Sequence, residues 1–132
     1  MNAAAAIQKR IQGMFPDLIG MEFVEAGPEL VSAKLKVRPD LCTGGSILHG
    51  GAIMAFADTI GAVATVLNIP EGAGTATLES KTNFFRPAPE GSEVTGKCVA
   101  LHKGRRTMTW QTTITSAEGK MIAVVTQTQM VL

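Results

Sequence analysis

A carboxylate, Asp58, lies in the middle of an apolar run that follows the tripeptide His49-Gly50-Gly51. An ionised group is costly to bury unless it is paired or has a task, so Asp58 is a candidate nucleophile or general base. Backbone N–H groups at the start of a helix have no acceptor within the helix, and glycines let a ligand approach them closely. The Gly50 N–H could therefore stabilise an oxyanion. A hydrogen-bonded structural Asp and a tight loop-to-helix entry are the competing interpretations.

Gly50 and Asp58 are eight residues apart, a separation of about 12 Å along an α-helix. One reacting carbonyl carbon cannot touch both groups of the same chain. Two chains could bring the groups together if their helices pair antiparallel about a two-fold axis, which would create two equivalent sites. The spacing therefore predicts a composite active site in a dimer.

The run from about residue 50 to 67 is apolar on all sides, which predicts a buried helix. Asp58 and Gly61 within it argue against a membrane-spanning segment. Apolar and polar residues alternate in residues 31–37 and along much of the chain after residue 75, which indicates half-buried strands. Short turns such as residues 117–119 join them, so neighbouring strands should be antiparallel. We expect an α+β architecture in which a curved antiparallel sheet wraps around a long central helix.

The length of 132 residues predicts a single domain, with a helical segment in residues 1–19. A net charge of +1 offers no general attraction for nucleic acid or for an anionic membrane. The absence of tyrosine and the single tryptophan leave no aromatic platform for stacking bases. Cys42 and Cys98 match no metal-binding pattern. We expect both to be reduced thiols of a cytoplasmic protein.

Three segments, LHGGAIMAFADTIG, TLESKTNFFRPA and GRRTMTWQTTITSAEGKMIAVVTQT, resemble hotdog-fold acyl-CoA thioesterases of the phenylacetic-acid-degradation (PaaI-like) type. The resemblance covers roughly residues 20 to 132. It implies hydrolysis of an aryl- or short- to medium-chain acyl-CoA without a cofactor or metal. It also implies a homodimer or homotetramer, a dimer of dimers, with active sites at the subunit interface.

By this resemblance, Gly50 is the oxyanion donor and Asp58 is the nucleophile or the general base. Thr77 matches a Ser or Thr that holds the attacking water or steers the carboxylate, and His49 orients the loop or the thioester. An ordinary structural role is the alternative for both. Many of these thioesterases carry Asn or Gln six residues before the histidine, where this chain has Thr43. The polar contact to the thioester carbonyl is therefore expected to differ here.

Coenzyme A carries phosphates, which arginine side chains bind well. The candidates for binding these phosphates are Arg86 and, in the turn HKGRR, Arg105 and Arg106. Gly51 is expected to border the substrate. A solvated charged turn is the alternative for the arginines. The acyl pocket should be lined by the N-terminal segment around Phe15 and by residues of the central helix, such as Ile53, Met54 and Phe56 or Ile60.

These residues are compatible with three different functions. An acyl-CoA thioesterase is favoured by the spacing of Gly50 and Asp58. A hotdog hydratase or dehydratase is disfavoured because glycines follow His49. A non-catalytic acyl-CoA-binding sensor is disfavoured by Asp58, whereas Thr43 keeps it open.

Overall fold

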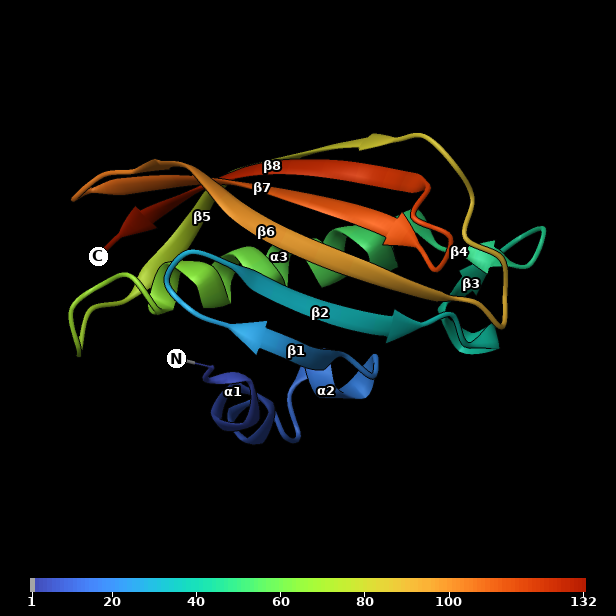
Figure 1. Ribbon diagram of the computed structural model, residues 1–132, viewed down its shortest axis with the longest axis horizontal. Helices are drawn as coiled ribbons and strands as arrows, with labels where there is room; N and C mark the ends of the chain where they lie inside the picture. Colours follow the sequence, from blue (N-terminus) through green and yellow to red (C-terminus); the bar gives the residue numbers. More distant parts are fainter. Residues whose placement is uncertain (1) are drawn as a thin grey trace.

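A six-stranded antiparallel sheet curves around one long helix in the computed structural model, which describes residues 2–132 (Figure 1). Across the sheet the strands follow the order β1-β2-β6-β7-β8-β5. Their bounds are β1 Glu22–Ala26, β2 Val31–Lys36, β5 Thr75–Phe84, β6 Glu93–Lys103, β7 Thr107–Ser116 and β8 Met121–Val131. The predicted α+β architecture is confirmed.

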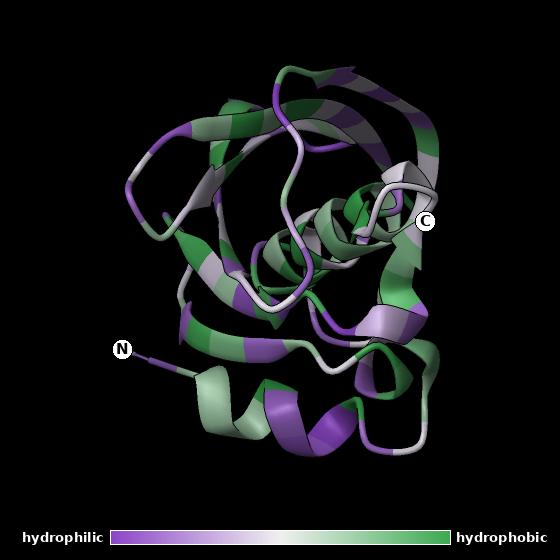
Figure 2. Cartoon of the chain, turned by 90° about the vertical axis from the view of Figure 1, so that its right-hand side faces the viewer, coloured by the Kyte–Doolittle hydropathy of each residue, from purple (hydrophilic) through white to green (hydrophobic). Residues whose placement is uncertain are grey.

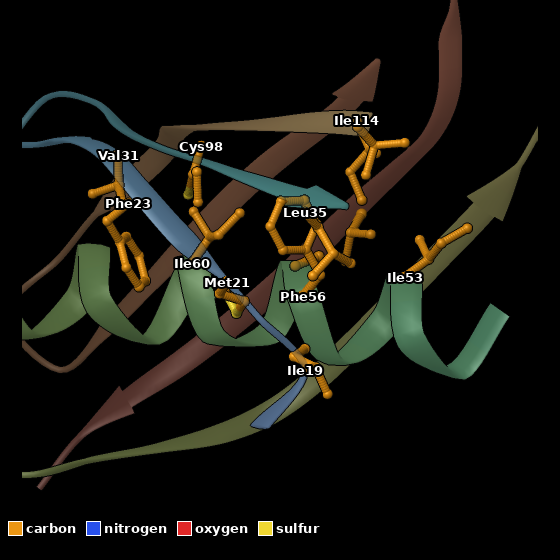
Figure 3. Close-up of a cluster of buried hydrophobic side chains, with 14 of the residues drawn as sticks. Ile19, Met21, Phe23, Val31, Leu35, Ile53, Phe56, Ile60, Cys98 and Ile114 are labelled. Atoms are coloured by element: carbon orange, nitrogen blue, oxygen red, sulfur yellow. The ribbon is translucent and has the colours of Figure 1, made fainter. Parts of the chain in front are cut away.

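The central helix α3, Gly50–Val66, packs against five of these strands. Its side chains Phe56 and Ile60 are completely buried. Figure 3 shows them pointing toward the strands that carry Leu35, Cys98 and Ile114. Burial of this apolar surface is the main favourable contribution to folding, and it holds α3 in a fixed position relative to the sheet.

Alternation of polar and apolar residues gives the sheet two different faces. In β7 every second residue from Met108 to Ile114 is buried, and the residues between them are partly exposed. Figure 2 shows the corresponding alternation of colour along the strands, with the largely hydrophobic helix enclosed between them. The inward face is therefore the one that can place side chains against α3.

Three short elements lead into α3. The 3-10 helix η1, Pro39–Leu41, precedes a small hairpin of β3, Cys42–Thr43, and β4, Ile47–Leu48. The Leu48 N–H donates to Ala88 O at 2.8 Å, which ties the hairpin to the loop after β5. These contacts fix the entry to α3, where the candidate oxyanion donor lies.

Residues 2–19 include two short helices, α1 Ala4–Arg10 and α2 Phe15–Leu18, and α1 packs on β1. Gly13, between them, has φ of 80°, a conformation that favours glycine. Within residues 2–132, each helix is too short or too polar to cross a bilayer.

Candidate active site

The first turn of α3 leaves one backbone N–H group free. Gly51 N–H donates to His49 Nδ1 at 2.7 Å, so His49 caps the helix with its side chain. Ala52 and Ile53 donate to His49 O at 2.9 and 3.1 Å. Gly50 N–H finds no acceptor anywhere in residues 2–132. Among the first-turn donors, it is the one available to a ligand.

A cavity of about 440 Å³ opens beside Gly50, between α3, the β3–β4 hairpin and the end of β5. Its walls are mostly apolar with a few polar groups, as is usual for small-molecule sites. Arg86, at this cavity, donates from Nη1 to Met121 O at 3.0 Å. The residues around it are Thr43, Ile47, Leu48, Gly50, Ile53, Phe84, Phe85, Arg86 and Pro87.

A second cavity of about 410 Å³ lies on the other side of the helix start, next to His49 and Gly51. Phe15 lines this second cavity, whereas Ile53 lines the first, so the two expected acyl-pocket residues border different cavities. The expectation for Phe56 and Ile60 is wrong, because both are fully buried in the core between α3 and the sheet. Met54 is 41% exposed and borders neither cavity.

Asp58 and Thr77 are brought together, as the resemblance implied. Thr77 Oγ1 lies 3.2 Å from Asp58 Oδ1 and donates a hydrogen bond to it. Asp58 is partly buried and borders neither of the two cavities near Gly50. Because Gly50 and Asp58 are separated by about 12 Å along one helix, a single chain does not hold both against one carbonyl group.

Sequence reasoning missed two glutamines of β8, each 1% exposed, that contact this pair. Gln129 Nε2 donates to Thr77 Oγ1 at 2.7 Å, and Gln127 Nε2 donates to Asp58 O at 3.4 Å. Gly61 makes room for Gln127, since a Cβ there would lie 2.3 Å from Gln127 Cδ. Period-two alternation continues from Val125 through Gln127 to Gln129, and that signal could have placed both glutamines on the inward face.

The three candidate arginines lie at opposite ends of the sheet within one chain. Arg86 follows β5, near the start of α3, whereas Arg105 and Arg106 form the exposed turn between β6 and β7 (Figure 1). That turn lies by the end of β8, where Arg106 O accepts from Val131 N–H at 2.7 Å. The three arginines therefore do not form one cluster within a single chain.

Both cysteines are free thiols. Burial raises the pKa of Cys98 to about 11. Desolvation, with the nearby carboxylates of Glu90 and Asp40, raises the pKa of Cys42 as well. A reactive cysteine needs a lowered pKa, so neither thiol is suited to act as a nucleophile. In residues 2–132, His, Cys, Asp and Glu form no group that could hold a metal ion.

Residues 45–123 match the model of the Thioesterase superfamily, which is more than half of the chain. The chain belongs to this superfamily. It is 34% identical over 112 residues to Rv1847, a candidate esterase of Mycobacterium tuberculosis, with 83% of this chain and 79% of that protein covered. It is 30% identical over 108 residues to the proofreading thioesterase EntH of Cronobacter turicensis, with 82% of this chain and 78% of that protein covered.

The structure also superposes on the crystal structure of the thioesterase HI1161 from Haemophilus influenzae. The TM-score is 0.92 at 27% identity, covering 98% of this chain and 90% of that one. The predicted family, the hotdog fold and thioester hydrolysis as the activity are thereby confirmed. This thioesterase thus combines a free N–H at Gly50 with a carboxylate farther along the same helix.

Proposed function

We propose that this thioesterase hydrolyses acyl-CoA at a site shared by two subunits. Gly50 of one subunit supplies the oxyanion-stabilising N–H, and Asp58 of the partner subunit is the nucleophile or general base. The observation that carries the proposal is that Gly50 N–H lacks an acceptor in residues 2–132, whereas the carboxylate lies about 12 Å away along α3. A second copy of the chain could bring its own Asp58 within reach of the same carbonyl.

The outer edge of β5 is the surface through which we expect two chains to pair. β5 is the last strand of the sheet order, so its second edge has no partner strand within residues 2–132. Leu78, Phe84 and Phe85 on and beside this strand are 57%, 52% and 56% exposed. A long unpaired edge flanked by exposed large apolar side chains is typical of an interaction surface.

The geometry of β5 suggests the register of this pairing. A bulge between Thr77 and Glu79 puts Ser80, Thr82 and Phe84 on the same inward face as Thr77. Residues directly opposite each other in an antiparallel pair share a face. When the extra residue of the bulge is not counted, Lys81 is the midpoint between Thr77 and Phe84 along β5. If Thr77 is opposite Phe84 of the partner subunit, the two-fold axis therefore passes through Lys81.

This register would bring the two reactive groups together. Asp58 accepts from Thr77, and a Cβ on Gly50 would lie 3.3 Å from the Phe84 ring. Placing Thr77 opposite Phe84 of the partner subunit therefore places Asp58 near the Gly50 N–H of the partner subunit. The same arrangement carries Arg105 and Arg106 of one chain toward the end of the sheet that holds Arg86 of the partner subunit.

The proposed reaction can follow two routes. As a general base, Asp58 takes a proton from water while the water oxygen attacks the thioester carbon. As a nucleophile, its carboxylate oxygen attacks that carbon, and water then hydrolyses the resulting mixed anhydride. On both routes Gly50 N–H stabilises the negative carbonyl oxygen. When this tetrahedral intermediate collapses, the C–S bond breaks, and the sulfur of coenzyme A leaves as the thiolate or takes up a proton. On the nucleophilic route this step forms the anhydride, and the later attack of water releases the acid and restores Asp58.

The first cavity is suited to the acyl part of the substrate. Its volume of about 440 Å³ and its apolar lining fit an aryl or a short- to medium-chain acyl group. Thr43 supplies a hydroxyl there for the thioester carbonyl or the water. His49 acts mainly by capping α3 behind Gly51. We place the reaction in the cytoplasm, where two free thiols would stay reduced.

The variant Asp58→Asn tests this function. The amide keeps the shape of the side chain but neither attacks a thioester nor takes up a proton, so hydrolysis should fall about a hundredfold or more. Release of coenzyme A from phenylacetyl-CoA and from a series of straight-chain acyl-CoA substrates is the measurement. Glu118→Gln, which makes the same chemical change in the exposed turn after β7, is the matched control.

Two results would contradict the proposal. Turnover by Asp58→Asn equal to that of the parent would remove the carboxylate from the mechanism. Tight binding of acyl-CoA by the parent protein without hydrolysis of any of these substrates would favour a sensor.

A further inference from the structure

A chain of side-chain hydrogen bonds runs from β8 to the proposed catalytic carboxylate. Gln129 Nε2 donates to Thr77 Oγ1 at 2.7 Å, and Thr77 Oγ1 donates to Asp58 Oδ1 at 3.2 Å. At the other end of the amide, Gln129 Oε1 lies 3.0 Å from Thr75 Oγ1. Since Gln129 is only 1% exposed, its amide is held between two hydroxyls of β5 rather than by solvent.

The direction of these hydrogen bonds determines whether the Thr77 hydroxyl can donate to Asp58. A threonine hydroxyl has one proton to donate and lone pairs with which to accept. Because Gln129 donates into Thr77 Oγ1, the Thr77 proton is free for another acceptor, and in residues 2–132 that acceptor is Asp58 Oδ1. With the Gln129 amide reversed, its oxygen would take the Thr77 proton, and the carboxylate would lose this donor.

We propose that Gln129 is a positioning residue for thioester hydrolysis, an inference that rests on the function proposed above. Its amide directs the Thr77 hydroxyl so that this hydroxyl donates to the Asp58 carboxylate and fixes its orientation. Gln127 holds Asp58 from the backbone side, with 3.4 Å between its Nε2 and Asp58 O. A carboxylate fixed in this way is preorganised for the reaction instead of sampling several rotamers.

The variant Gln129→Met tests the inference, because methionine keeps the length of the side chain and removes both polar ends. The matched control is Gln111→Met, on the opposite face of the sheet in β7. For Gln129→Met we expect kcat to fall at least tenfold and KM to stay within twofold of the parent value. Gln111→Met should leave both constants within twofold.

A double variant separates positioning from general damage. If Gln129 acts through Thr77, then Gln129→Met combined with Thr77→Val should have the same kcat as Thr77→Val alone. Thr77→Ser, which keeps the hydroxyl, should retain most of the activity. Fold-losses that multiply in the double variant, or a Gln129→Met kcat within twofold of the parent, would overturn the inference.

The outcomes for the proposed function remain distinguishable. Full turnover by Asp58→Asn would refute that function. An inactive Asp58→Asn together with full kcat in Gln129→Met would overturn only the role of Gln129.

A measurement that does not depend on the folding of Gln129→Met is NMR of the side-chain amide groups. In the parent protein the Gln129 side-chain NH₂ should exchange slowly with solvent. In Thr77→Val its signals should shift and exchange at least tenfold faster, whereas those of Gln111 stay unchanged. Gln129 signals that are identical in the parent and in Thr77→Val would overturn the inference.

Discussion

The indole N–H of Trp110 on β7 donates a hydrogen bond of 2.8 Å to Thr65 Oγ1 on α3. The Thr65 hydroxyl in turn donates to Gly61 O at 2.9 Å. Trp110 and Thr65 are both buried, at 1% and 0% exposure. This polar link joins the last turns of the helix to the centre of the sheet and so fixes the helix that carries Asp58.

We predict that Thr65→Val lowers the free energy of unfolding by about 1–3 kcal/mol, because it leaves the Trp110 N–H buried without an acceptor. Urea unfolding followed by tryptophan fluorescence measures the change. Thr59→Val is the matched control, since Thr59 makes the same bond to the carbonyl four residues earlier, at 2.9 Å, without contacting an indole. Equal stabilities of Thr65→Val and Thr59→Val would show that the indole contact contributes nothing.

A second prediction concerns alkaline pH. Cys98 has a pKa raised to about 11 by burial, whereas a cysteine in the unfolded chain has a pKa of about 8.5. Between these values the unfolded state binds fewer protons than the folded state, so the free energy of unfolding falls as pH rises. The stabilisation is complete below pH ~8.5 and is lost as the pH rises through the folded-state value.

Chemical denaturation at several pH values from 8 to 11 checks this prediction. In Cys98→Ala the decline of stability with pH should be shallower than in the parent by up to about 1.4 kcal/mol per pH unit. The lysines contribute equally to both proteins, and the chain contains no tyrosine. Parallel pH dependences for the parent and Cys98→Ala would contradict the assignment.

A third prediction tests the register of the proposed dimer. If the two-fold axis passes through Lys81, the Lys81 side chains of the two subunits lie opposite each other. Lys81→Cys should then form a covalent dimer under mild oxidation, because cross-strand Cβ atoms approach to about 4.5–5.5 Å. Glu79→Cys, two residues away on the same face of β5, is the control and should not cross-link to itself. Cross-linking of Glu79→Cys instead of Lys81→Cys would require another register.

The elements that carry the site could be predicted from the sequence because they obey simple periodicities. Alternation in residues 31–37 and the all-round apolar run after Gly51 determine strand and helix. The acyl-pocket residues on α3 could not be predicted in the same way. A helix that is apolar on all sides does not reveal which face the sheet covers, and the sheet covers Phe56 and Ile60.

The buried polar residues were the second part of the site that was not predicted from the sequence. Gln127 and Gln129 sit in the final β-branched run, whose alternation puts them on the same face as Val125, although glutamine side chains are mostly exposed in proteins. Their burial depends on the pairing of β8 with β5 and on the space left by Gly61. The alternation predicts the face of these side chains, but the pairing and the space that hold them are long-range relationships. The β3–β4 hairpin was missed for a related reason, since its strands are only two residues each.

Subunit complementation tests the shared active site most directly. Asp58→Asn lacks the carboxylate. Gly50→Pro lacks the N–H, at a first helical position where proline is tolerated. Each variant alone should be inactive. In a mixed dimer, Gly50 of the Asp58→Asn chain meets the intact Asp58 of the other chain, so one of the two sites is restored.

The measurement is acyl-CoA hydrolysis after the two inactive proteins are unfolded together, mixed in equal amounts and refolded. Random assembly makes half of the dimers mixed, with one intact site in each, so about a quarter of the parent activity should return. Each variant refolded alone should stay inactive. Mixtures that remain as inactive as the separate variants, although dimers form, would contradict a site built from two chains.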